Sequence, residues 1–180
     1  MPKKQLPTHT PIKVWDIGVR LFHWFTVALF AYAYFSGEDA DTLHENAGYL
    51  VAGLAVFRCL WGVVGSDYAR FAQFIPGPRM LWGYLRALLS GNEARYLGHN
   101  PLGGVMILLL LLLLLTVPFT GWLLTTDWGW GNEFAEQLHI VSTNIALATI
   151  AIHVCGVIYM SVKHGENLPK AMITGRKYHS

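Results

Sequence analysis

The sequence predicts an all-α membrane protein, with one domain over residues 1–180 in which four transmembrane helices form a bundle. Of its 180 residues, 53% are hydrophobic and only 13% are charged, whereas soluble domains are typically about 25% charged. Four apolar runs reach the roughly 17–25 residues that cross a bilayer as a helix. We place these spans at approximately 17–35, 47–64, 102–124 and 140–162.

The charged residues segregate in a way that supports four spans and gives their orientation. All thirteen Lys and Arg residues fall on one side of this topology. Because positively charged loops remain in the cytoplasm, we expect both termini to be cytoplasmic. The two loops on the other side carry seven acidic residues and no basic one, namely Glu38, Asp39, Asp41, Glu45, Asp127, Glu133 and Glu136.

The longest loop joins the second and third spans and contains a predicted interfacial helix. Pro78 is a favourable first residue for a helix. The residues that follow it, roughly 79–89, combine apolar and aromatic side chains with Arg79 and Arg86. An amphipathic segment of this kind is typical of a helix that lies in the membrane surface.

The first span has a competing interpretation as a cleaved signal peptide. Ala31-Tyr32-Ala33 resembles the small-residue cleavage pattern. However, the apolar run is longer than the roughly 7–15 residues of a typical signal-peptide core. We therefore interpret residues 17–35 as a retained transmembrane helix.

Four histidines occur in or beside the apolar spans, and they sort into two depths. His139 and His153 are fourteen residues apart, so on one helix they share a face and differ in height by about 21 Å. His23 lies in the cytoplasmic half of the first span, and His44 lies near the outer start of the second. The topology therefore pairs His44 with His139 at an outer level and His23 with His153 at an inner level.

Polar side chains inside a membrane are costly and usually mark a functional site. Two imidazoles on opposite sides of one plane are the axial ligands of a six-coordinate haem iron, and four-helix bundles hold such groups between facing helices. Taken singly, His44 or His139 has the alternative role of an interfacial packing residue. The paired depths favour two haem groups. Neither Cys59 nor Cys155 belongs to a Cys-x-x-Cys-His motif, which excludes covalent c-type attachment.

Two arginines are candidate partners for haem propionates. Arg58 follows His44 by fourteen residues, which places it on the same helix face at the inner level. A buried guanidinium needs an anionic partner, although Arg58 has the alternative of extending to the membrane surface. Arg20, three residues before His23, is a second candidate.

Glycines in the spans have two interpretations. Gly48 and Gly53 in the second span, Gly121 in the third and Gly156 in the fourth allow a flat macrocycle to approach the backbone. Close packing between helices is an equally good explanation.

His99 and His164 flank the cytoplasmic membrane surface. Either side chain has the chemistry to hydrogen-bond a quinone carbonyl or to carry its proton. The alternative is an ordinary polar residue at the interface.

Five stretches of the chain carry a recognisable combination of motifs. They are Val14-Trp15-Asp16 through Arg20-Leu21-Phe22-His23-Trp24, His44-Glu45-Asn46-Ala47-Gly48-Tyr49, Gly98-His99-Asn100-Pro101-Leu102-Gly103, Thr120-Gly121-Trp122 and His164-Gly165-Glu166-Asn167. Together they resemble the bacterial cytochrome b561 family, which includes the b-type subunits of nickel–iron hydrogenases. The resemblance covers nearly the whole chain and implies four helices, two non-covalent b haems and electron exchange with the quinone pool. It implies haem ligands on the first, second and fourth helices, which match His23, His44, His139 and His153 here.

These observations predict an electron relay in the bacterial inner membrane, between quinone and a periplasmic redox protein such as a c-type cytochrome or a hydrogenase-like complex. We assign no catalytic residue, and we interpret the basic side as a topology signal and not as a nucleic-acid site. One alternative is a superoxide:quinone oxidoreductase on the same fold, although the acidic outer loops would repel superoxide. Another is a transition-metal transporter, which would require acids or thiolates grouped with histidine at one depth.

Overall fold

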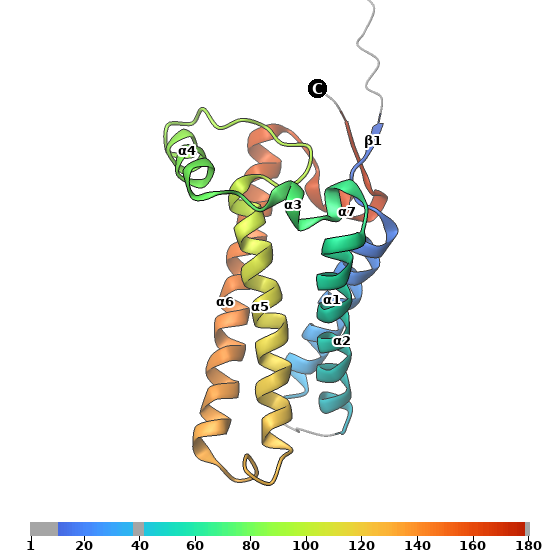
Figure 1. Ribbon diagram of the computed structural model, residues 1–180, viewed down its shortest axis with the longest axis vertical. Helices are drawn as coiled ribbons and strands as arrows, with labels where there is room; N and C mark the ends of the chain where they lie inside the picture. The colour runs from blue at the N-terminus through green and yellow to red at the C-terminus, as the bar shows by residue number, and fades with distance from the viewer. Residues whose placement is uncertain (1–10, 38–41, 179–180) are drawn as a thin grey trace, which may run out of the picture.

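The structure is a computed structural model that describes residues 11–37 and 42–178, and four long helices dominate it (Figure 1). Within the described residues, these four are the helices long and apolar enough to cross a membrane. The prediction of an all-α protein with four spanning helices is confirmed. The four helices are α1 (Ile17–Phe35), α2 (Thr42–Val64), α5 (Pro101–Leu124) and α6 (Glu133–His164).

α1 matches its predicted span at both ends, α2 and α5 match at their C-terminal ends, and α6 extends beyond its predicted span at both ends. α1 has the predicted bounds, whereas α2 and α6 begin before the predicted residues 47 and 140. The first turns of these two helices are polar, so a search for apolar runs does not find them. The start of α6 is marked instead by Asn132, whose side chain accepts from the backbone N–H groups of Phe134 and Ala135. The 32 residues of α6 are about 48 Å long, so this helix extends beyond a hydrocarbon core of about 30 Å.

The short elements gather at one end of the bundle, which we call the terminal end because both described chain ends lie there (Figure 1). β1 (Pro11–Lys13) and β2 (Arg176–Tyr178) pair there as antiparallel strands. A helix over the predicted residues is observed as α4, beginning at Pro78, and its position in the membrane surface stays a prediction. The other short elements are the 3-10 helix η1 (Asp67–Ala69), α3 (Phe71–Phe74), α4 (Pro78–Leu89) and α7 (Leu168–Thr174).

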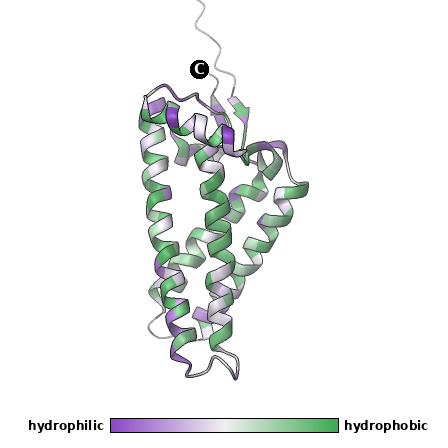
Figure 2. Cartoon of the chain, turned by 60° about the vertical axis from the view of Figure 1, so that its left-hand side comes forward, coloured by the Kyte–Doolittle hydropathy of each residue, from purple (hydrophilic) through white to green (hydrophobic). Residues whose placement is uncertain are grey.

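The spanning helices pack in chain order: α1 on α2, α2 on α5, and α5 on α6. The buried face of α2 is made largely of small side chains, including Ala47, Val51 and Ala55, which allow close approach between helices. The main buried apolar cluster lies at the terminal end, where Trp15 and Val19 pack with neighbouring residues. Hydrophobic residues follow the spanning helices, and hydrophilic residues concentrate at the ends (Figure 2).

The opposite end of the bundle, which we call the hairpin end, carries the turn between α5 and α6 (Figure 1). Glu45, Asp127, Glu133 and Glu136 belong to this end. Lys3 and Lys4, and Glu38, Asp39 and Asp41 of the first acidic loop, lie outside the described residues. The described basic residues lie toward the terminal end, so the charge segregation of the sequence corresponds to two ends of the folded chain.

Candidate functional site

His44 of α2 and His139 of α6 lie close together near the hairpin end. Their ring centroids are 6.4 Å apart and their planes are nearly perpendicular, at 86°. A bond between a metal and an imidazole nitrogen is about 2 Å long, so two imidazoles on opposite sides of one metal have ring centres about 6 Å apart. The observed separation therefore fits one metal ion held between the two rings.

A hydrogen bond to the backbone orients His44. Its Nδ1 lies 2.9 Å from the carbonyl oxygen of Ala33 in α1. Because a carbonyl can only accept, Nδ1 carries the proton and Nε2 carries the lone pair. This tautomer presents Nε2 as the metal-binding atom.

Thr120 of α5 orients His139 in the same sense. The Thr120 hydroxyl donates to the carbonyl of Val117 at 2.8 Å, and its oxygen lies 3.0 Å from His139 Nδ1. The oxygen therefore accepts from Nδ1–H, which again leaves the lone pair on Nε2. Ser142 lies 3.2 Å from the same hydroxyl and donates to the His139 carbonyl at 2.9 Å.

The backbone of α5 also makes room for the His139 ring. A Cβ atom added at Gly121 would lie 3.2 Å from His139 Cε1, which is a crowded contact. Side chains at Gly48, Gly53 or Gly156 would meet no atom within 4 Å. Packing against another helix therefore explains the glycine at position 121 but not at the other three, whose open backbone is compatible with the approach of a flat ring.

Sequence reasoning missed Thr120 and Ser142, which are 2% and 6% exposed. Partners of this kind fix the tautomer and orientation of metal-binding histidines. The available signal was a hydroxyl side chain within an apolar span, but spacing alone did not connect Thr120 on one helix with His139 on the next.

His23 of α1 and His153 of α6 form the inner pair, and they lie close enough to interact electrostatically. The His23 ring packs edge-on against Trp24, with centroids 4.9 Å apart. Its Nδ1 is buried and has no hydrogen-bond partner among the described residues. A buried polar atom without a partner is unusual in a native protein.

Arg58 is only 2% exposed, so the alternative in which it extends to the membrane surface does not hold. Its Nη2 donates to the Ala69 carbonyl at 3.0 Å, and its guanidinium lies 5.2 Å from the centroid of the Phe71 ring. A Cβ atom at Gly62 would lie 2.2 Å from that ring, so glycine is required for this packing. Nη1 is buried and has no partner among the described residues.

Arg20 has a different environment. Its guanidinium donates to the carbonyl of Ile173 in α7. Arg20 therefore ties the start of α1 to the C-terminal segment, which makes it a weaker candidate than Arg58 for a cofactor contact.

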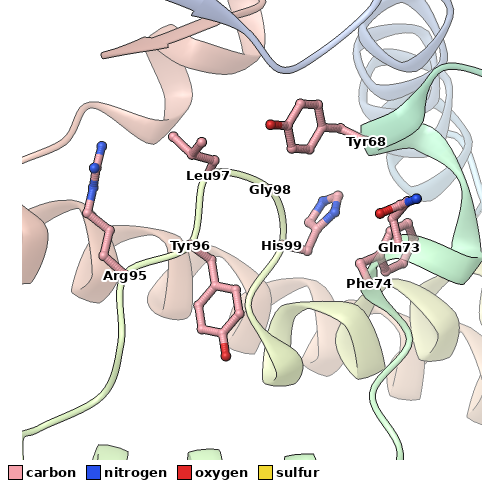
Figure 3. A pocket seen from close by; sticks show the side chains of 8 residues that line it. All are labelled: Tyr68, Gln73, Phe74, Arg95, Tyr96, Leu97, Gly98 and His99. Carbon is pink, nitrogen blue, oxygen red and sulfur yellow. The ribbon is translucent and has the colours of Figure 1, made fainter. Parts of the chain in front are cut away.

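The structure separates the other two candidate histidines. His99 lies between the rings of Trp15 and Phe74, with centroid distances of 4.5 and 4.8 Å, and it lines a cavity at the terminal end (Figure 3). Burial, followed by the nearby charge of Arg58, lowers the pKa of His99 to about 3, so the ring is neutral near pH 7.

His164 instead joins an ion cluster at the end of α6. Its Nε2 lies 3.9 Å from Glu93 Oε1, and the Lys163 ammonium lies 2.6 Å from the same oxygen. The hydrogen bond from Lys163 lowers the pKa of Glu93, which keeps this carboxylate ionised. Within residues 11–37 and 42–178, no group of three or more His, Cys, Asp or Glu side chains is arranged to hold a metal ion.

Comparison with known families gives a match over most of the chain. Residues 14–175 match the family model of prokaryotic cytochrome b561. The chain belongs to this family. Membership implies binding of haem b and a role in electron transfer, and with four spanning helices the chain is a multi-pass membrane cytochrome.

Curated relatives of this cytochrome carry one shared description. A protein of Azotobacter vinelandii, named as a probable Ni/Fe-hydrogenase B-type cytochrome subunit, is 26% identical over 76% of this chain and 68% of its own length. A Rhizobium leguminosarum bv. viciae protein of the same name is 22% identical over 92% of this chain and 88% of its own. A probable Ni/Fe-hydrogenase 1 B-type cytochrome subunit of Escherichia coli K12 is 23% identical over 71% of this chain and 66% of its own. No solved structure matches the chain.

Proposed function

We propose that this cytochrome binds two haem b groups, one between His44 and His139 and the other between His23 and His153, and relays electrons across the membrane. The observation that carries the proposal is the outer pair. Its rings are 6.4 Å apart, and hydrogen bonds at both Nδ1 atoms direct both Nε2 lone pairs to metal binding. The electrostatic interaction between His23 and His153 supports the inner site.

Haem iron supplies one-electron redox chemistry. Two histidines per iron leave no coordination position for a substrate, which favours electron transfer over oxygen binding at the metal. The chain's own residues hold the imidazoles in one tautomer and position the two levels on the single helix α6. Fourteen residues along that helix correspond to about 21 Å, so the levels cover much of the membrane thickness.

Arg58 completes the inner site in this proposal. Its buried Nη1 would donate to a haem propionate, and such a charge-assisted hydrogen bond is stronger than one between neutral groups. Arg20 is already engaged with α7, so it contributes to holding the start of the helix that carries His23.

The proposed orientation places the terminal end in the cytoplasm and the hairpin end outside the bacterial inner membrane. It follows from the concentration of Lys and Arg at the terminal end. The acidic hairpin end favours a partner with a basic docking surface through electrostatic steering. By analogy with the names of its relatives, a nickel–iron hydrogenase is the first partner to test and a c-type cytochrome the second.

Quinone is the proposed electron carrier at the terminal end. The inner histidine pair lies nearer this end. His99 lines a cavity there, and its buried Nδ1 has no hydrogen-bond partner among the described residues, whereas His164 lies beside Glu93.

The haem content of the purified full-length chain tests this function. We expect a Soret band, two haems per chain in a pyridine haemochrome assay, and reduction of both haems by an added quinol. A chain without a Soret band would overturn the proposal. A ratio of one haem per chain would remove one of the two levels, and haems that no quinol reduces would remove the link to the quinone pool.

A further inference from the structure

An apolar groove of about 370 Å³ lies along one side of α1, near the terminal end. The side chains at positions 17, 21, 24 and 28 follow the spacing of three and four residues that places them on one face of a helix. A residue of α7 forms the other wall. The apolar lining consists of Ile17, Leu21, Trp24, Phe25 and Ala28 from α1 and Ile173 from α7.

This groove lies on the side of α1 away from the inner histidine pair. His23 follows Val19 by four residues and precedes Thr26 by three, so these three share one face of the helix. Val19 and Thr26 are buried, whereas the apolar side chains of the groove are exposed. A turn of 100° per residue separates His23 from Leu21 by about 200°. The groove is therefore separate from the proposed haem sites.

The length of the groove corresponds to one leaflet of a bilayer. Eleven residues separate Ile17 from Ala28, which is about 16 Å along a helix. Half of a hydrocarbon core of about 30 Å is roughly 15 Å. Because α1 begins at Ile17, the groove extends from the membrane surface at the terminal end into one leaflet. A lipid acyl chain has the length and the chemistry to lie in it.

Three cations lie where the groove meets the terminal end. Figure 1 shows β1 and α7 beside the start of α1. The Arg20 guanidinium donates to the Ile173 carbonyl, and a Cβ atom added at Gly175 would lie 3.4 Å from its Nη1. Lys13 and Arg176 are exposed and directly opposite each other in the β1–β2 pair. Like charges directly opposite each other in an antiparallel pair are destabilising.

These three cations have no carboxylate partner of their own. Among the described residues, no ion pair includes any of them. Two neighbouring acids are engaged elsewhere: Asp16 accepts from Trp61, and Glu166 pairs with Arg95 and Lys177. A group of unbalanced cations at a membrane surface attracts anionic lipid headgroups.

We propose that this groove binds one anionic phospholipid, with an acyl chain along α1 and with the headgroup phosphate beside Arg20, Lys13 and Arg176. The guanidinium groups match the geometry of a phosphate, and the phosphate relieves the repulsion between the opposed cations of the sheet. A second copy of this chain is a less suitable occupant, because a two-fold contact through this surface would bring the same cations together.

Photo-crosslinking tests the location of the lipid. The full-length haem-loaded chain, in detergent, is labelled with a phosphatidylglycerol that carries a diazirine on one acyl chain, and the labelled peptides are identified by mass spectrometry. We expect labels within residues 17–28 and 168–174 that unlabelled phosphatidylglycerol displaces. Phosphatidylcholine, which has no net charge, should displace them at least fivefold less effectively. Inorganic phosphate should not displace them, because the acyl chain supplies part of the affinity.

Replacement of the sheet cations separates lipid binding from a structural role. Lys13→Gln and Arg176→Gln should each weaken displacement by phosphatidylglycerol about fivefold, as expected for one cation near an anionic lipid. Each also removes the like-charge pair, so the melting temperature without lipid should be unchanged or higher. Arg79→Gln, at an exposed position of α4, is the matched control and should leave the labelling unchanged. Lost labelling together with a lower melting temperature would overturn the proposal in favour of a structural role.

A second pair of variants tests the apolar part of the groove. Ala28→Trp fills its inner end and should reduce labelling within residues 17–28, whereas Ala148→Trp, at an exposed position of α6, should not. Labels spread over all four spanning helices, equal displacement by phosphatidylcholine, or displacement by inorganic phosphate would overturn the lipid site. A dimer that excludes the label from α1 would assign the groove to a second copy and would also overturn it. The Soret spectrum of each variant reports the haems separately, so the proposed electron relay is tested independently.

Discussion

Replacement of Thr120 by Val isolates the hydrogen bond that orients His139. The Thr120 side chain is 2% exposed, and its oxygen lies 3.0 Å from His139 Nδ1. Val has nearly the same shape but cannot accept a hydrogen bond. The Val117 carbonyl is another acceptor near the ring, and the proton on Nδ1 would then have to bond there.

The expected magnitude follows from the burial of this contact. Leaving a buried donor without a partner costs about 1–3 kcal/mol, and loss of a partner behind a metal-binding histidine typically lowers metal affinity about 10–100-fold. We therefore expect weaker retention of the outer haem and an altered outer-haem signal, with the inner haem unchanged. The measurement is haem retention during dilution, followed by optical and electron paramagnetic resonance spectra.

Thr116→Val provides the matched control, because Thr116 lies one turn earlier on α5 and its hydroxyl donates to Leu112 within that helix. It removes the same group without touching His139. Equal haem retention and equal spectra in the two variants would refute the role of Thr120.

Two further predictions concern the terminal end. Arg58→Met should lower the reduction potential of the inner haem by roughly 60 mV, equivalent to about 1.4 kcal/mol for one electron, because a buried positive charge is lost. Arg20→Met serves as the control, and a redox titration showing equal shifts at both haems would contradict the propionate contact. His99 has a pKa of about 3 in the folded chain and about 6.5 when unfolded. As the pH falls below 6.5, the unfolded chain therefore gains a proton at this histidine before the folded chain does. Between pH 6.5 and 5 the free energy of unfolding should fall by about 2 kcal/mol more in the wild type than in His99→Gln. Thermal unfolding measures this difference. If the change of pH lowered the stability of the wild type and of His99→Gln equally, His99 would not be buried in its neutral form.

Hydropathy and charge were sufficient to predict the spanning helices, because membrane helices satisfy their backbone internally and show long apolar runs. The pairing of His44 with His139 was also predictable, since the topology assigns a depth to each residue. Hydropathy did not locate the polar first turns of α2 and α6, which lie beyond the apolar part of each helix.

The contacts that tune the sites were not predictable from spacing. Thr120 and Ser142 reach His139 through a particular rotation of α5 against α6, which depends on side-chain packing along both helices. The fourteen-residue interval predicts a depth for Arg58, but the burial of its side chain depends on Phe71, a residue of a short helix outside the spans. The cavity beside His99 is lined by residues of η1, α3 and the loop before α5, so no local sequence pattern predicts it.

The central claim is that four histidines form two pairs at two levels, and single Ala replacements with separate detection of the two haems test it most directly. His44→Ala or His139→Ala should remove or alter one haem and leave most of the signal of the other. His23→Ala or His153→Ala should do the converse. If the His44 and His23 variants instead affected the same haem, the pairing of His44 with His139 and of His23 with His153 would be contradicted.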